Sequence, residues 1–261
     1  MLGGHGAADA ITSRQREIVQ IVGDKGFATI DALAQHFAVS AQSIRRDIIQ
    51  LDEAGLLQRF HGGAGLRDAN VRLGYTEKHG RATDAKARIG KAAAALVPDG
   101  ASVFLDVGTT TEAVALALRQ RGIGCRVFTT SLAVAMSLAG HREIELHVFG
   151  GASRTPDGSL VGAATVAAIA EIHFGYAFLG YSGFDDDGAL MDFDLDKIAV
   201  KRAALRRTDA AVAVGDATKF ARRALARLAP AGDFAHLVTD APPPKHLAMA
   251  FRESGVGLIV A

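Results

Sequence analysis

Residues 39–64 read V-S-A-Q-S-I-R-R-D-I-I-Q-L-D-E-A-G-L-L-Q-R-F-H-G-G-A, and they decide the fold of the N-terminal part of the chain. Ile44, Ile48 and Leu51 recur at spacings of four and three, which places them on one face of a helix. Arg45 and Arg46 fall on other faces of that helix. A DNA-recognition helix needs an apolar stripe that docks on its own domain and a polar stripe that meets base edges and phosphates. The spacing predicts such a helix.

Two more helices are expected before the recognition helix. An apolar helical stripe ends at Gly26, and a short helix is predicted over residues 30–37. Thr29 or Asp31 is expected to cap the short helix, because both carry a side-chain oxygen that can accept from a free backbone N–H. The tight turn that follows ends in Ser40, whose hydroxyl is expected to cap the recognition helix in the same way.

A short strand with a glycine turn is expected after the recognition helix. Gly55 ends the helix, residues 56–60 are apolar with one basic residue, and the turn follows at residues 61–63. This pattern predicts the wing of a winged helix-turn-helix. We predict that DNA contacts come from Ser40, Gln42, Ser43, Arg45, Arg46, Arg59 and His61.

The two arginines also allow a plainer interpretation. Arg45 and Arg46 can form a solvated helix face with Asp47 and Asp52 as partners. The turn before them and the glycine-ended strand after them favour DNA contact. Net charge gives no help, because the chain carries +1 and residues 14–67 hold seven Lys and Arg against six Asp and Glu. Binding is therefore expected to rest on a local basic stripe that is doubled in a dimer.

Composition describes a chain that can bury a large core. Its 261 residues are 49% hydrophobic, which fits one small and one medium domain. Cys125 is the single cysteine and cannot form an internal disulfide. No apolar run reaches membrane-spanning length, and the first ten residues lack the apolar core of a signal peptide. We expect a cytoplasmic protein without membrane contact.

From Lys86 onward, short apolar runs alternate with helical stripes. The predicted strands cover residues 102–105, 125–128, 146–149, 176–179, 211–214, 236–238 and 258–260. The predicted helices cover residues 89–97, 111–121, 132–139, 161–172 and 197–207. This alternation predicts a doubly wound α/β sheet. In such sheets ligands bind beyond the carboxyl ends of the strands.

The loops at those ends are rich in glycine and hydroxyl side chains. Residues 106–111 read D-V-G-T-T-T between a strand and a helix, and they offer backbone N–H groups, hydroxyls and a helix dipole to an anion. Thr129–Thr130–Ser131, Gly150–Gly151 with Arg154, and Gly180 with Gly183 follow the next three strands. Any one of these loops reads as an ordinary turn. Their repetition favours a site for a phosphate-bearing ligand.

Both parts of the chain resemble the DeoR family of bacterial transcriptional regulators. The N-terminal match is V-S at residues 39–40 and S-I-R-R-D at 43–47, followed by the glycine-ended strand. The C-terminal match includes D-V-G-T-T-T, G-G-A-S-R, S-L-V-G, A-F-L-G-Y-S-G, V-K-R and D-A-T-K-F, so the similarity runs from Arg14 over nearly the whole chain. The resemblance implies a sheet domain like that of sugar-phosphate isomerases, and a repressor controlled by a phosphorylated sugar or polyol.

The resemblance also implies roles for individual residues. Asp106 and the loop after it would hold sugar hydroxyls and phosphate, and Lys219 would add a cation. Lys201 is a second candidate cation, although its helical surroundings fit a surface salt bridge equally well. The predicted effector-binding residues are Asp106, Gly108, Thr109, Thr110, Thr111, Thr129, Thr130, Ser131, Arg154, Gly180, Gly183 and Lys219.

Two residues depart from the family pattern. Thr130 stands where asparagine is usual, and Lys197 stands where glutamate is common. The second change reverses a charge. It implies either a more anionic effector or the use of a nearby acid, Asp192, Asp194 or Asp196.

The predicted organisation is a disordered N-terminus over residues 1–12, a winged helix-turn-helix over 13–66, a linker over 67–85 and an α/β effector-sensing domain over 86–261. The expected partners are a double-stranded DNA operator, a small phosphorylated effector and a second copy of the chain. We expect no enzymatic activity, no cofactor and no metal, because the histidines do not cluster at zinc spacing. Two alternatives remain: a sugar-phosphate isomerase that uses Asp106 or one of Asp185 to Asp187 as base beside Lys219, and a purely structural oligomerisation domain.

Overall fold

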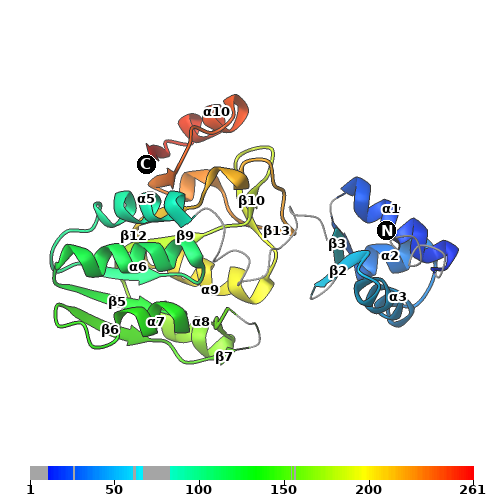
Figure 1. Ribbon diagram of the computed structural model, residues 1–261, viewed down its shortest axis with the longest axis horizontal. Coiled ribbons are helices and arrows are strands. Elements are labelled where there is room, and N and C mark those ends of the chain that lie inside the picture. Colours follow the sequence, from blue (N-terminus) through cyan, green and yellow to red (C-terminus); the bar gives the residue numbers. More distant parts are fainter. Residues whose placement is uncertain (1–10, 26, 61–62, 67–82, 154, 156) are drawn as a thin grey trace, which may run out of the picture. The chain divides into compact units, whose positions relative to one another are not determined.

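The computed structural model describes residues 11–25, 27–60, 63–66, 83–153, 155 and 157–261, which form two compact units divided between residues 73 and 74 (Figure 1). Two predicted site residues, His61 and Arg154, lie outside the described residues. So do residues 1–10 of the expected N-terminal tail and 67–82 of the expected linker. None of the described helices combines the length and apolar character needed to cross a membrane.

The N-terminal unit is a winged helix-turn-helix, as predicted. Its elements are α1 (Ser13–Lys25), β1 (Phe27–Thr29), α2 (Ile30–Phe37), α3 (Ala41–Glu53), β2 (Leu57–Phe60) and β3 (Gly63–Leu66). The strands form an antiparallel sheet in the order β1-β3-β2, and β2 and β3 are the two strands of the wing. The predicted face of α3 is buried, since Ile44, Ile48 and Leu51 are at most 1% exposed.

Side-chain caps set the turn between α2 and α3. Thr29 Oγ1 accepts from Ala32 N at 3.1 Å and Ser40 Oγ accepts from Ser43 N at 3.2 Å, so both predicted caps are present. Ala38 closes α2 with φ 52°, a left-handed conformation that disfavours any residue with a Cβ. This backbone geometry lets α3 begin after only three intervening residues.

The C-terminal unit is built on a parallel sheet of seven strands. In spatial order these are β15 (Gly257–Val260), β14 (His236–Thr239), β12 (Thr208–Val214), β9 (Phe174–Gly180), β4 (Ser102–Leu105), β5 (Cys125–Thr129) and β6 (Ile144–Val148). Each predicted strand corresponds to one of them; β9 and β12 begin two and three residues before their predicted starts, and β6 is shifted toward the N-terminus by two residues at its start and one at its end. The α/β fold class is therefore confirmed.

Helices cover both faces of this sheet. One face carries α5 (Thr83–Ala94), α6 (Thr109–Arg121) and α7 (Leu132–Leu138), which lie side by side in Figure 1. The other face carries α8 (Ala163–Ala170), α9 (Leu195–Leu205) and α10 (Lys245–Glu253). Two separate apolar clusters fill the space between sheet and helices, one on each side. The helix α5 begins at Thr83, within the range expected to be linker.

The strand order reverses between β4 and β9. The chain first builds β4, β5 and β6 in one direction, and then adds β9, β12, β14 and β15 on the other side of β4. The carboxyl ends of β4 and β9 therefore flank the point where loops leave in opposite directions, which is where doubly wound sheets bind ligands.

Several short elements and one helix were not predicted. The strands β10 (Gly183–Phe184), β11 (Leu190–Asp192) and β13 (Ala226–Ala229) form a small second sheet, and β7 (Ala152–Ser153) pairs with β8 (Leu160–Val161). The short 3₁₀ helices η2 (Ala217–Lys219) and η3 (Ala231–Asp233) and the helix α10 were also missed.

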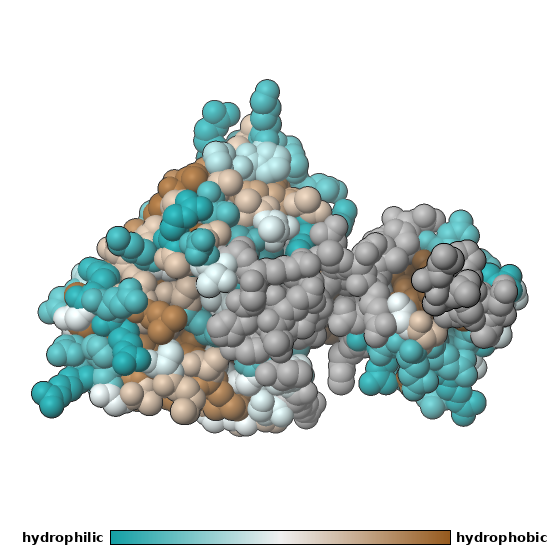
Figure 2. Space-filling view, viewed as in Figure 1, coloured by the Kyte–Doolittle hydropathy of each residue, from teal (hydrophilic) through white to brown (hydrophobic). Residues whose placement is uncertain are grey.

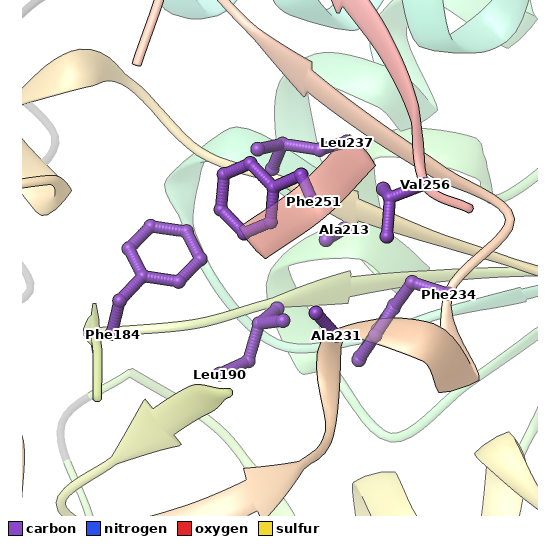
Figure 3. A pocket seen from close by; sticks show the side chains of 8 residues that line it. All are labelled: Phe184, Leu190, Ala213, Ala231, Phe234, Leu237, Phe251 and Val256. Atoms are coloured by element: carbon purple, nitrogen blue, oxygen red, sulfur yellow. The ribbon is translucent and has the colours of Figure 1, made fainter. Parts of the chain in front are cut away.

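An apolar hollow lies between α10 and the small sheet. Figure 3 shows the side chains around it, among them Phe184, Leu190, Phe234 and Phe251. It leaves no room for a water molecule and has no polar lining surface. This hollow is a gap in core packing, lined by apolar side chains alone.

Candidate functional site

The recognition helix α3 presents its basic side chains to solvent. Gln42, Arg45 and Arg46 are exposed, and Ser43 is half-buried. Within the described part of the chain, no carboxylate lies within ion-pair distance of Arg45 or Arg46. The alternative in which Asp47 and Asp52 neutralise the two arginines therefore lacks support in the structure.

Asp47 instead holds α3 against α1. Its carboxylate is buried and accepts from Arg14 Nε at 2.7 Å and from Gln15 Nε2 at 3.2 Å. Gln15 Nε2 also donates to Gln50 Oε1 at 2.6 Å. The network fixes the orientation of α3 relative to α1.

The wing adds one described basic residue. Arg59 on β2 has an exposed side chain, and its backbone N–H donates to Asp52 Oδ1 at 3.3 Å. Asp52 thus fastens the start of the wing to α3. Ser40 is exposed at the N-terminus of α3, where free backbone N–H groups favour a phosphate.

A buried lysine forms the centre of the second candidate site. Lys201 on α9 is 3% exposed, and its Nζ lies 3.1 Å from Asp106 Oδ2 and 2.5 Å from Asp192 Oδ2. It also donates to the carbonyl oxygen of Gly180 at 2.7 Å. The surface salt bridge considered for Lys201 is therefore wrong. The side chain ties α9 to the carboxyl ends of β4 and β9.

The two carboxylates around Lys201 have different surroundings. Asp106 Oδ2 accepts from Gly180 N at 2.9 Å, across the point where the strand order reverses. Burial raises the pKa of the Asp106 carboxyl, and the Lys201 ammonium opposes this change. Asp192 Oδ1 accepts from Ser182 Oγ at 2.7 Å. Burial alone would raise its pKa, but Lys201 and Ser182 hold the pKa of Asp192 well below its usual range.

The loop after Asp106 opens the helix α6. Gly108 adopts φ 139° and precedes the first helical residue, so the free N–H groups of the first turn face the edge of the sheet. Thr110 and Thr111 are buried, whereas Gly108 and Thr109 are half-buried. Thr111 Oγ1 donates to Gly108 O at 2.7 Å. This arrangement fits the predicted anion-binding loop.

Lys219 adds a cation at the same edge. It ends η2 after β12 and feels the charges of Asp192, Lys201, Asp216 and Arg222. Burial, together with the neighbouring cations, lowers the pKa of Lys219 to about 8. Among the residues that the structure describes, no carboxylate oxygen lies within ion-pair distance of its ammonium. The charge is therefore available to an anionic ligand.

The predicted residues after β5 are fully buried. Thr129 Oγ1 donates to Leu105 O at 2.7 Å, and Ser131 Oγ caps α7 by accepting from Val134 N. Thr130 Oγ1 is buried without a hydrogen-bond partner among the described residues. The hydroxyls of Thr129 and Ser131 thus hold the loop in place. The hydroxyl of Thr130 makes no hydrogen bond to the described residues.

The two predicted glycines, Gly180 and Gly183, differ in how closely other atoms approach them. A Cβ at Gly180 would lie 3.5 Å from Asp106 Oδ2, and one at Gly183 would lie 2.2 Å from Arg222 O. Gly183 begins β10, directly after Ser182. Gly183 therefore permits the close packing beside Ser182, whereas a Cβ at Gly180 would make only an ordinary contact with Asp106.

The residues around Lys197 clarify the departure from the family pattern. Lys197 Nζ forms an ion pair with Asp157 and is 4.0 Å from Asp194 Oδ2. Asp194 caps α9, and Asp196 is exposed on its first turn. Of the acids considered in place of the usual glutamate, Asp192 alone contacts Lys201 in the structure.

The acidic turn Asp185 to Asp187 lies apart from this cluster. Asp185 pairs with Arg223 and Arg227, and Asp187 pairs with Arg227 at 2.8 Å. These residues join β10 to β11 at the surface. Sequence reasoning found Asp106, the loop after it and Lys219, but it missed Ser182 and the central position of Lys201.

A winged helix-turn-helix ahead of an α/β unit with a polar, cation-bearing edge defines a DNA-binding regulator with a sensor domain. The chain matches the DeoR-like helix-turn-helix domain over residues 14–70 and the DeoR C-terminal sensor domain over residues 81–241. It belongs to the DeoR family of transcriptional regulators.

Its relatives include named repressors. The glycerol-3-phosphate regulon repressor of Escherichia coli K12 is 36% identical over 89% of this chain and 92% of its own length. The transcriptional repressor CsqR of the same organism is 31% identical over 95% of this chain and 94% of its own length. Ribose 5-phosphate isomerase A from Methanocaldococcus jannaschii is 19% identical, covers 52% of this chain and 53% of its own, and has a TM-score of 0.40. Nothing about function rests on that last similarity.

Proposed function

We propose that the chain represses genes of sugar or polyol metabolism and releases its operator when a phosphorylated sugar or polyol binds at the carboxyl edge of the large sheet. The relative that regulates the glycerol-3-phosphate regulon suggests sn-glycerol 3-phosphate as the first ligand to test.

Two observations carry this proposal: the charge on Lys219 after β12, and the N-terminus of α6 after β4, both at the carboxyl edge of the sheet. Lys219 has no ion-pair partner among the described residues, and the first turn of α6 offers free N–H groups behind Gly108. A phosphate dianion satisfies both, because it accepts hydrogen bonds and neutralises a cation. In this proposal Gly108, Thr109 and Thr110 contact the phosphate.

Most of the other predicted residues support the site without contacting the phosphate. Asp106 is 1% exposed and already binds Lys201 and Gly180, so we assign it the role of holding these groups in place. Thr129 and Ser131 hold their loop, and we assign to the polyol part of the effector the hydroxyl of Thr130, which is buried without a partner among the described residues.

We propose binding without turnover. An isomerase needs a base that can reach a C–H bond next to a carbonyl and exchange its proton. Asp106 is enclosed, and Asp185 to Asp187 are paired with Arg223 and Arg227 at the surface. These contacts favour a sensor over an enzyme.

The DNA side requires two copies of the chain. One recognition helix with Arg45 and Arg46 contacts few phosphates, so a dimer on two half-sites is needed for firm binding. Exposed apolar side chains offer a surface for such contacts: Leu132 and Met136 on α7 and Val148 on the edge strand β6. Apolar residues are also seen on the face of the C-terminal unit in Figure 2.

A ligand panel tests the proposal. Purified protein is heated with sn-glycerol 3-phosphate, hexose phosphates, unphosphorylated glycerol and inorganic phosphate, and each mixture is checked for product by NMR. At a ligand concentration of about 100 Kd, we expect stabilisation by roughly 2.7 kcal/mol, with no product. Product formation would show an enzyme. The absence of any stabilisation by a phosphorylated compound would remove the effector proposal, and a gel shift with operator DNA would then test the repressor alone.

A further inference from the structure

We propose that the ion pair between Asp157 and Lys197 is a positioning pair, which braces the loop between β7 and β8 against α9 and fixes the part of the site that receives the polyol end of the effector. Its role in binding rests on the proposed function above. The brace itself is defined by contacts of described residues on three segments.

The first segment is the loop after β5, which is joined to the β7–β8 loop by main-chain hydrogen bonds. Leu160 N donates to Thr130 O at 2.8 Å, and Leu132 N donates to Gly158 O at 3.0 Å. The free hydroxyl of Thr130 belongs to this loop. The position of Thr130 therefore depends on the position of residues 158–160.

Asp157 organises the second segment, which is the described part of the β7–β8 loop, residues 155 and 157–159. Its Oδ1 accepts from Thr155 Oγ1 at 2.5 Å and from Ser159 N at 3.2 Å. The hydroxyls of Thr155 and Ser159 lie 2.8 Å apart. One carboxylate oxygen is thus used within the loop, and Oδ2 is left to pair with Lys197.

Lys197 belongs to the third segment, α9, and is 8% exposed. It lies one turn before Lys201, on the same side of the helix. Lys201 is fixed to Asp106 and Asp192. The same rigid helix therefore carries one lysine that holds the strand ends and another that holds the β7–β8 loop.

The pair is shielded from solvent, unlike most surface ion pairs. The side chains of Lys197 and Asp157 are 9% and 18% exposed. Burial alone would raise the pKa of Asp157. The pKa of this carboxyl is nevertheless held below its usual range by the Lys197 ammonium and by hydrogen bonds from Thr155 and Ser159. Removal of Lys197 leaves this carboxylate without its main partner, so the loop must rearrange to hydrate it. The loop that carries Thr130 then loses the support of residues 158–160.

The test compares full-length wild-type protein with Lys197→Met, Asp157→Asn and the exchanged double variant Asp157→Lys/Lys197→Asp. Lys91→Met, at an exposed lysine of α5, is the matched control. Hydrogen exchange measured by mass spectrometry follows the peptide over residues 155–162 without ligand. Calorimetry follows sn-glycerol 3-phosphate and inorganic phosphate.

We expect Lys197→Met and Asp157→Asn to accelerate exchange in this peptide and to weaken sn-glycerol 3-phosphate binding about tenfold. Inorganic phosphate should bind as in wild type, since Lys219 and the first turn of α6 are untouched. The exchanged pair should recover neither property, because a lysine at position 157 cannot accept from Thr155 Oγ1 and Ser159 N; full recovery would mean that the ion pair alone, without these bonds, holds the loop.

If hydrogen exchange in the peptide over residues 155–162 is unchanged in both single variants, the proposal that the ion pair braces this loop is overturned. Faster exchange with unaltered sn-glycerol 3-phosphate affinity would overturn its role in positioning the site. If wild-type protein binds neither compound, the effector proposal fails, and the brace is then judged by the exchange measurement alone.

Discussion

Arg14 Nε donates a hydrogen bond of 2.7 Å to Asp47 Oδ2, and this contact joins the first helix of the chain to its recognition helix. The buried amide of Gln15 shares the same carboxylate. Asp47→Ala is expected to lower the unfolding free energy by about 1 kcal/mol through the Gln15 contact, since the Arg14 side chain is exposed and can be hydrated. Chemical denaturation of the N-terminal unit measures this.

Operator binding should fall with Asp47→Ala although Arg45 and Arg46 are intact, because the angle of α3 is no longer fixed. Glu53→Gln at the exposed end of α3 is the control. Operator affinity equal to wild type in Asp47→Ala would mean that the contact with α1 does not orient α3.

The two candidate sites should respond to separate substitutions. Arg46→Ala removes an exposed cation and is expected to weaken operator binding while effector affinity stays the same. Thr110→Val removes a hydroxyl from the first turn of α6 and should have the opposite effect. Gel shifts and calorimetry measure the two affinities. Should both variants lose the same property, the division into a DNA site and an effector site is wrong.

Lys201→Met should destabilise the C-terminal unit strongly. The substitution leaves Asp106 and Asp192 buried beside each other without the ammonium between them. Loss of one partner from a buried ion pair costs about 3–5 kcal/mol. Thermal unfolding is compared with Lys91→Met, which should shift stability by less than about 0.5 kcal/mol. A loss no larger than that of the control would show that Lys201 is dispensable for the fold.

Effector binding should weaken as the pH rises through 8. The Lys219 ammonium has a pKa of about 8, so it loses its charge above that value, whereas a phosphate monoester is already a dianion above about pH 7. Calorimetry at pH 7, 8 and 9 follows the change. Lys219→Arg should flatten the profile, because arginine stays protonated throughout this range. A flat profile in wild-type protein would remove Lys219 from the site.

The turn before the recognition helix offers a stabilising substitution. Ala38 has φ 52°, which glycine adopts without the steric cost of a Cβ, so Ala38→Gly should raise the unfolding free energy by up to about 1 kcal/mol. Ala54 follows α3 in a right-handed conformation, which alanine adopts without strain. Ala54→Gly should therefore lower the unfolding free energy. Denaturation midpoints of the two variants should move in opposite directions.

Patterns of local spacing predicted most of the fold. Ile44, Ile48 and Leu51 identified the recognition helix because its apolar stripe is complete within two turns. The central strand β4 is a short apolar run because both of its faces are covered, whereas the edge strands β6 and β15 include exposed positions. The strands β10 and β11 are too short to show a period, and α10 was missed although Leu247 and Phe251 are spaced as on one helical face.

The candidate site was predictable only where its residues follow a strand. Asp106 and the loop after it were found because a strand, a glycine and a helix meet there. Lys201 sits among charged residues in a helix, a pattern typical of an exposed face, and its partner Asp192 ends a strand that had not been predicted. Lys197 and Asp157 are 40 residues apart, so no local pattern connects them.

The adjacency of β4 and β9 has a consequence for how the protein acquires its site. Phe104 pairs with Ala177, and the intervening chain includes β5 and β6, which lie on the other side of β4 in the same sheet. Pairing across such a separation is slow, because the entropy of closing the loop is lost before the contacts form. The N-terminal unit has no comparable requirement, since its strands and helices are close in sequence. During synthesis and refolding, the DNA-reading surface should therefore be complete before the chain can sense anything.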